Sequence, residues 1–176
     1  HWIPWISTIF ISVPFLLWIY SLSLKHQPLI GNLVVSLLAG TVPLLVILFE
    51  YPLLTRLHAN IVSDNPELFK PIIIWVGLFS LFAFLTNLIR ELVKDGQDIE
   101  GDEEAGSKTV AILIGLAQLK WLVFGLAAFT LGSLTAIFVF LLPGQLNLAY
   151  FVILLAVPFL LLLFKVLKVN HPADWK

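Results

Sequence analysis

The sequence predicts an all-α protein, a polytopic bundle of about five transmembrane helices. Two observations lead to this fold class. Of the 176 residues, 60% are hydrophobic and only 12% are charged, with a mean hydropathy of +1.00. A soluble domain carries about 25% charged residues, so lipid must face much of this chain. The apolar residues also gather into long runs, and about 20 helical residues cross the roughly 30 Å hydrocarbon core of a bilayer.

Five apolar runs contain no charged residue and are predicted as the membrane helices. They cover residues 2–20, 29–49, 71–89, 121–142 and 148–164. Pro14, Pro43 and Pro158 lie inside three of them, where neighbouring helices can compensate for a kink. The predicted connections are residues 24–28, 50–70, 90–120 and 143–147, and the third of these is the polar centre of the chain.

Composition also bears on the kind of protein and its partners. With no internal repeat or low-complexity linker, residues 1–176 are predicted to be a single membrane domain. Because the chain begins at His1 and contains no Met, we expect it to be an incomplete piece of a longer membrane protein. Cysteine is absent, which excludes a disulfide, a thiolate nucleophile and a zinc–sulfur site within these residues. A net charge of −1 argues against nucleic acid as a partner.

The basic residues predict the orientation in the membrane. Eight of the ten Lys and Arg residues fall on one side when the helices alternate in direction, and only Arg56 and Lys70 fall on the other. Cytoplasmic connections carry an excess of Lys and Arg. The sequence therefore predicts that the acid-rich connection and the C-terminal tail are cytoplasmic.

Acidic residues follow a helical spacing at the end of the third apolar run. Asn87, Glu91, Asp95, Asp98 and Asp102 step by four, four, three and four residues, which places them on one face of a helix. Carboxylates on one face repel one another, and a divalent cation relieves that repulsion. Magnesium commonly takes one or two carboxylates together with substrate phosphates. The stripe therefore predicts a site for magnesium and a diphosphate, with the last three carboxylates within reach of a common cation.

A solvated acidic loop is the alternative interpretation of the same residues. Gly96 and Gly101 favour it, because both weaken a helix and so interrupt the stripe. Asn87 favours a functional site, because a polar side chain inside a membrane segment costs free energy and is usually functional.

Two runs carry a family resemblance. The first is RELVKDGQDIEGD (residues 90–102) followed by AGSKT (105–109), and the second is YSLSLK (20–25) followed by PLIGN (28–32). The first resembles the second aspartate-rich motif of the UbiA superfamily of membrane prenyltransferases, and the second resembles an earlier connection of that family. Both are most similar to the clade that contains digeranylgeranylglyceryl phosphate synthase and chlorophyll synthase.

The resemblance implies a fold and a chemistry. Family members have nine transmembrane helices, of which this chain resembles helices four to eight. Two aspartate-rich motifs hold Mg²⁺ ions that bind a prenyl diphosphate, and an acceptor attacks the allylic cation formed when the diphosphate leaves. By resemblance, Asp98 and Asp102 are the metal-binding pair and Asp95 supports them as the third catalytic carboxylate. The implied partners are a prenyl diphosphate donor, a lipid or lipid-phosphate acceptor and the membrane lipid.

The resemblance also implies residues that bind the substrates. These are Lys25 and Lys108 at the diphosphate, Arg90 and Lys94 as further diphosphate contacts, Tyr20 at the polar end of the cavity, and Asn87 and Asn32 as positioning groups. The alternative roles are positive-inside anchors for the two lysines, an interfacial aromatic for Tyr20, and a cap or packing contact for Asn32.

The chain departs from the family pattern in three places. Glu103 follows the last aspartate, where the family usually has a basic residue, Gly96 stands where many relatives have a bulkier one, and Lys25 comes five residues after Tyr20 rather than four. The first aspartate-rich motif would lie before His1. We therefore expect residues 1–176 alone to be inactive.

The leading hypothesis is an intramembrane prenyltransferase. It moves a geranylgeranyl-like isoprenoid from its diphosphate to a lipid acceptor such as geranylgeranylglyceryl phosphate. The alternatives are a transferase of the same family with an aromatic or chlorophyllide acceptor, a non-catalytic membrane scaffold, and an ion-transport fragment.

Overall fold

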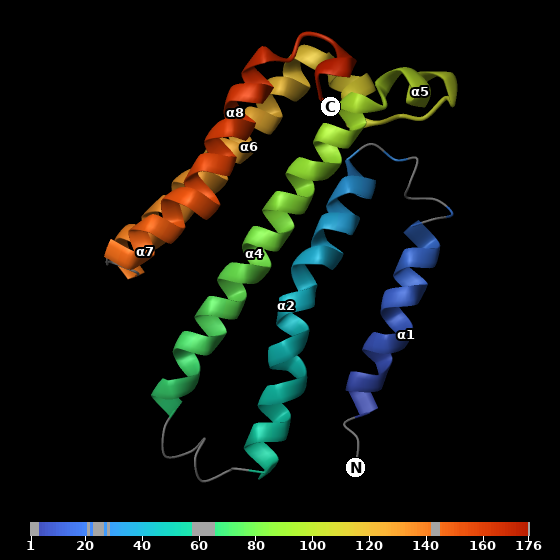
Figure 1. The fold of residues 1–176 in the computed structure, drawn as a ribbon. Helices are drawn as coiled ribbons and strands as arrows, with labels where there is room; N and C mark the ends of the chain where they lie inside the picture. The colour runs from blue at the N-terminus through green and yellow to red at the C-terminus, as the bar shows by residue number, and fades with distance from the viewer. Residues whose placement is uncertain are drawn as a thin grey trace. The chain divides into compact units, whose positions relative to one another are not determined.

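A computed structural model describes residues 4–20, 22, 27, 29–57, 66–141 and 145–175. Within these residues every regular element is a helix, which confirms the predicted all-α class (Figure 1). The chain divides into two compact units, His1–Asn87 and Leu88–Lys176, and the boundary falls inside one helix. The single membrane domain expected over residues 1–176 therefore stays a prediction.

Four helical segments are long and apolar enough to cross a bilayer. They are Ile30–Leu57, Phe69–Gln97, Val110–Leu141 and Asn147–Lys168. Backbone groups inside lipid have no water to bind, so these apolar runs satisfy them within a helix. Together with the family assignment below, the four spans make the chain an integral membrane protein. The predicted run 2–20 forms α1 (Pro4–Ile19), whose 16 described residues fall short of a full span.

The first unit contains α1, α2 (Ile30–Leu57) and the beginning of α4 (Pro66–Gln97). α2 and α4 approach closely at Gly40, where an added Cβ would lie 2.9 Å from Cβ of Phe84 and 3.0 Å from the Ser80 carbonyl oxygen. The Ser80 hydroxyl donates a hydrogen bond to the Gly40 carbonyl. Small residues and interhelical hydrogen bonds are the usual means of packing helices in lipid.

The second unit contains the end of α4, α5 (Ile99–Glu104), α6 (Val110–Leu141), α7 (Gln145–Tyr150), the π-helix η2 (Phe151–Ala156), α8 (Val157–Lys168) and the 3₁₀ turn η3 (Pro172–Trp175). α6 and α8 pack side by side (Figure 1). Leu119, Val123 and Ala127 on α6 and Val166 on α8 are buried in this unit. α6 is kinked at Gly115, which has a positive φ of 79°.

The helices extend further than their apolar runs. The expected connection 50–70 is partly helical, because α2 continues to Leu57 and α4 begins at Pro66. Likewise α6 begins at Val110, eleven positions before the apolar run at Trp121. A helix of 32 residues is about 48 Å long, against a hydrocarbon core of roughly 30 Å. Charged residues end the apolar runs, but the helices continue beyond them.

Candidate functional site

The acidic residues lie at a break between two helices. α4 ends at Gln97, Asp98 has φ −97° and ψ 7°, and α5 begins at Ile99. Hydrogen bonds still cross the break, from the Asp98 amide to the Lys94 carbonyl (3.0 Å) and from the Asp102 amide to the Asp98 carbonyl (2.9 Å). The stripe expected to run through Asp102 is therefore not one regular helix, as the two glycines suggested. Asp98 and Asp102 nevertheless remain one helical turn apart.

A local hydrogen-bonding motif ends α5 and reverses the chain after Asp102. The Ser107 amide donates to the Asp102 carbonyl (2.9 Å) and the Gly106 amide donates to the Glu103 carbonyl (3.0 Å). Gly106 has a positive φ of 68°. This pair of bonds around a left-handed glycine is a Schellman motif. It ties Ser107 to the backbone of Asp102. Residues 98–107 are called the acidic turn, and Lys108 follows directly on it.

The two carboxylates predicted to bind metal have no protein partner among the described residues. Asp98 is exposed and Asp102 is partly buried, and neither side chain forms an ion pair or a hydrogen bond in that part of the chain. Asp95 is partly buried and has a polar interaction of its own. Asp98 and Asp102 thus present two unpaired carboxylates on adjacent turns.

Asp95 lies before the break in the helix and Asp102 after it, and the common cation expected for them and Asp98 stays a prediction. Within residues that the structure describes, no group of three His, Cys, Asp or Glu side chains could hold a metal ion. The break at Asp98 gives the reason, because it ends the regular stripe from Asp95 to Asp102. Two carboxylates one turn apart still suit magnesium, which takes one or two carboxylates and completes its shell with substrate oxygens and water. Asp98 and Asp102 therefore fit a magnesium ion as a pair of ligands.

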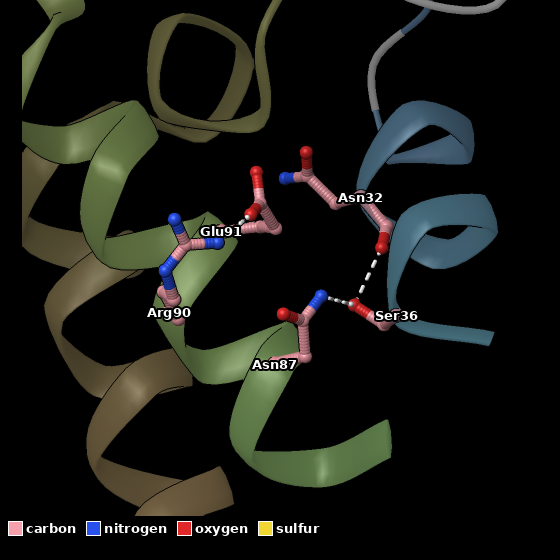
Figure 2. Close-up of polar contacts among 5 residues, drawn as sticks. All are labelled: Asn32, Ser36, Asn87, Arg90 and Glu91. Atoms are coloured by element: carbon pink, nitrogen blue, oxygen red, sulfur yellow. Dashed lines mark hydrogen bonds and ion pairs between the residues drawn. The ribbon is translucent and has the colours of Figure 1, made fainter. Parts of the chain in front are cut away.

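The basic residues predicted to contact the diphosphate differ in their surroundings. Lys94 and Lys108 are exposed. Arg90 is held in an ion pair with Glu91, with 2.7 Å between Nη1 and Oε1 (Figure 2). Lys25 lies outside the described residues. Lys94 and Lys108 thus flank the acidic residues on either side in the chain, while Arg90 already neutralises a carboxylate.

The amide and phenol groups lie in the first unit. Asn87 donates to the hydroxyl of Ser36 over 3.4 Å, and Ser36 donates to the Asn32 carbonyl over 2.6 Å (Figure 2). Asn87 therefore has a structural partner on α2, which supports a packing role beside the positioning role expected for it. Asn32 and Tyr20 are partly buried, and each takes part in a hydrogen bond, a ring contact or an electrostatic interaction.

Sequence reasoning gave three further residues near the acidic turn no role of their own at the site. Glu91 is buried although it is charged, and the Thr109 hydroxyl is buried without a partner in the described chain. Trp175 is buried against the end of α4, far from it in sequence. The sequence feature that could have indicated a role for Glu91 is its place in the acidic stripe. For Thr109 that feature is its place just before α6, and for Trp175 the sequence offers no feature beyond the residue type.

The comparisons with known proteins agree with these features. A model of the UbiA prenyltransferase family matches residues 3–176. The chain belongs to that family. The four membrane-capable helices accord with a UbiA protein. No solved structure matches the chain.

The relatives of this UbiA chain include proteins named digeranylgeranylglyceryl phosphate synthase. The one from Thermococcus kodakarensis is 38% identical over 56% of the chain, and the one from Methanopyrus kandleri is 41% identical over 57%. The one from Pyrococcus horikoshii is 32% identical over 72% of the chain. The matches cover 28%, 30% and 37% of these three relatives, so the chain spans about a third of their length.

Proposed function

We propose that this chain is part of a membrane prenyltransferase that moves a geranylgeranyl-like group from its diphosphate to a lipid acceptor such as geranylgeranylglyceryl phosphate. The observation that carries the proposal is that Asp98 and Asp102, in a chain of the UbiA family, have no side-chain partner among the described residues. The relatives' name describes a glyceryl phosphate bearing two geranylgeranyl groups, which supports an acceptor that already bears one. Aromatic and chlorophyllide acceptors are the alternatives.

The reaction requires a polar site next to an apolar one. The bond between the allylic carbon and the diphosphate oxygen breaks, and its electron pair leaves with the diphosphate. A glycerol hydroxyl oxygen then bonds to that carbon and releases its proton, which the departing diphosphate can accept. A dry apolar environment protects the allylic cation from water, and membrane helices supply one.

The proposed roles of the residues follow from their charge and position. Asp98 and Asp102 would hold Mg²⁺, with Asp95 supporting them. Bound Mg²⁺ supplies charge that stabilises the leaving diphosphate. Lys108, exposed and following directly on the Schellman turn, would bind a diphosphate oxygen, where negative charge develops. Lys94 would add positive charge to the same region.

An apolar surface in the first unit is suited to hydrocarbon. α2 and α4 form an open groove of about 450 Å³ lined by Leu37, Leu44, Leu81 and Phe84 together with smaller residues. Its volume lies in the usual range for ligand sites. We propose that such helix surfaces accommodate the isoprenoid chain, while the acidic turn and the C-terminal tail lie on the cytoplasmic side.

The deciding experiment measures Mg²⁺-dependent transfer by the full-length protein in membranes. Labelled geranylgeranyl diphosphate is supplied with geranylgeranylglyceryl phosphate, and Asp98→Asn and Asp102→Asn are compared with Glu100→Gln. We expect each aspartate variant to lose about 10²- to 10³-fold in rate, as when a charge-stabilising group is removed. Glu100→Gln removes an exposed charge from the same helix and should retain activity.

The outcomes separate the alternatives. Transfer only to aromatic or chlorophyllide acceptors would keep the reaction class and overturn the lipid acceptor. Full activity of both aspartate variants would refute the metal-binding pair. If no acceptor leads to consumption of the diphosphate, the scaffold and ion-transport hypotheses replace this one.

A further inference from the structure

The C-terminal turn, residues 169–175, docks against the end of α4. Trp175 in η3 is buried, and its indole lies against Gly96. A Cβ added at Gly96 would come within 2.8 Å of the indole Nε1 and 2.9 Å of Cε2 of Trp175, and within 3.0 Å of Leu119 Cδ2. Real Cβ atoms do not approach other atoms so closely, so the indole sits in a space that exists only because residue 96 is a glycine.

Hydrogen bonds from α4 and α6 hold the docked turn, and others order it internally. The Gln97 side-chain amide donates to the Trp175 carbonyl over 2.6 Å, and the Lys120 ammonium donates to the Val169 carbonyl over 2.9 Å. Within the turn, Asp174 accepts the amides of Asn170 and His171, each over 2.8 Å. These two amides hold the pKa of Asp174 below its usual range, because both hydrogen bonds favour the charged carboxylate. The turn is therefore both internally ordered and bonded to α4 and α6.

The contact falls between two residues of the proposed site. Gly96 and Gln97, which contact Trp175, separate Asp95 from Asp98. Regular helix stops immediately after them, at Asp98. A contact that restrains residues 96 and 97 therefore also restrains the point where the chain turns from α4 into α5. It thereby restrains the direction in which the Asp98 and Asp102 side chains project.

We propose that Trp175 is a positioning residue for the acidic turn: its docking at Gly96 fixes the break between α4 and α5 and so the spacing of Asp95, Asp98 and Asp102. This inference rests on the proposed function for its catalytic meaning. Trp175 acts through the backbone of residues 96–98 and not by contact with substrate. It also accounts for a glycine at position 96, next to the catalytic carboxylates, because any side chain there would displace the indole.

The shape of the indole, rather than its N–H group, makes the contact. Nε1 of Trp175 is buried without a hydrogen-bond partner in the described residues. A phenylalanine would keep much of the ring packing and remove the unpaired donor, whereas alanine would empty the space. Trp175→Phe is therefore the conservative variant, and Trp175→Ala the disruptive one.

The test uses the full-length protein and two independent measurements. Hydrogen exchange of a peptide covering residues 97–104 reports the order of the acidic turn, because the Asp98 and Asp102 amides are bonded across the break. The Mg²⁺ concentration at half-maximal prenyl transfer reports how tightly the proposed aspartate ligands bind the ion. Outer-shell partners of metal ligands typically change metal affinity by 10- to 100-fold.

We expect Trp175→Ala to speed exchange of that peptide at least about 10-fold and to raise the Mg²⁺ requirement about 10-fold, with the acceptor KM unchanged. Trp175→Phe should retain most of the slow exchange and most of the low Mg²⁺ requirement of the wild-type protein. Gly96→Ala should behave like Trp175→Ala, because its methyl group displaces the indole. Trp121→Ala is the matched control, since it removes an exposed tryptophan from α6 of the same unit.

Three outcomes would overturn the inference. Unchanged exchange in Trp175→Ala would show that the turn does not depend on docking. Faster exchange with an unchanged Mg²⁺ requirement would make Trp175 a purely structural residue. A wild-type protein that transfers to no acceptor would overturn the proposed function and the catalytic meaning of the contact, while the exchange measurement would still decide whether Trp175 orders the turn.

Discussion

Gly106 and Gly101 lie close together in the acidic turn but have opposite backbone requirements. Gly106 has φ 68° and closes the Schellman motif, whereas Gly101 lies in α5 with nothing within 4 Å of an added Cβ. A left-handed conformation costs a residue with a side chain about 1–2 kcal/mol. A glycine in a helix is less stable than alanine by about 0.5–1 kcal/mol.

We predict that Gly106→Ala loosens the turn and that Gly101→Ala tightens it. Hydrogen exchange of residues 99–110 should become faster in the first variant, because the hydrogen bonds from Gly106 and Ser107 weaken, and slower in the second. Equal effects of the two substitutions would mean that the Schellman motif does not order this turn.

At the level of single residues, sequence reasoning identified the acidic side chains but not all of their partners. Gly96 was noted as a helix-weakening residue and as a departure from the family, yet its contact with Trp175 joins residues 79 positions apart. Arg90 was predicted to contact substrate, and the structure pairs it with its neighbour Glu91. Pairing of this kind depends on rotamers and burial, which composition and spacing do not reveal.

At the level of helices, Gly40 is a point of close approach between α2 and α4. An alanine there would place its Cβ 2.9 Å from Phe84 Cβ and 3.0 Å from a backbone oxygen, which cannot move without shifting a helix. Overpacking of this kind typically costs about 1–3 kcal/mol.

We therefore predict that Gly40→Ala lowers the melting temperature of the full-length protein in detergent. Gly77→Ala is the control, because it adds the same methyl group on α4 with nothing within 4 Å. A melting temperature that falls equally in both variants would indicate a general effect of removing helix glycines rather than a close contact between α2 and α4.

The helices themselves were largely predictable, while their ends were not. Each of the four membrane-capable segments overlaps a run identified from hydropathy alone. One end of each segment lies several residues beyond its run, at Leu57, Gln97, Val110 and Lys168, because helices continue past the hydrocarbon boundary into polar sequence. The break at Asp98 was suggested only by neighbouring glycines.

At the scale of the whole molecule, orientation in the membrane is the property that charge counting predicts. Lys and Arg cluster on the side of the acidic turn and the tail, which predicts that this side is cytoplasmic. Because residues 1–176 contain no cysteine, single cysteines introduced here can be labelled specifically once any others in the full-length protein are replaced.

We predict that a cysteine at position 104 is labelled by a membrane-impermeant thiol reagent only after intact cells are opened, and that one at position 67 is labelled from outside. Glu67 and Glu104 are both exposed, so both sites should react in opened cells. The reverse pattern would place the acidic turn outside and would contradict the positive-inside prediction.

The sequence by itself determined the all-α membrane architecture, the family and the acidic residues of the proposed site. Hydropathy settles the architecture because an apolar run must form a helix in lipid whatever its neighbours are. Tertiary structure decided how the acidic region is arranged, through the break at Asp98 and the docking of Trp175 at Gly96. These features depend on contacts between residues far apart in the chain, which local patterns do not specify.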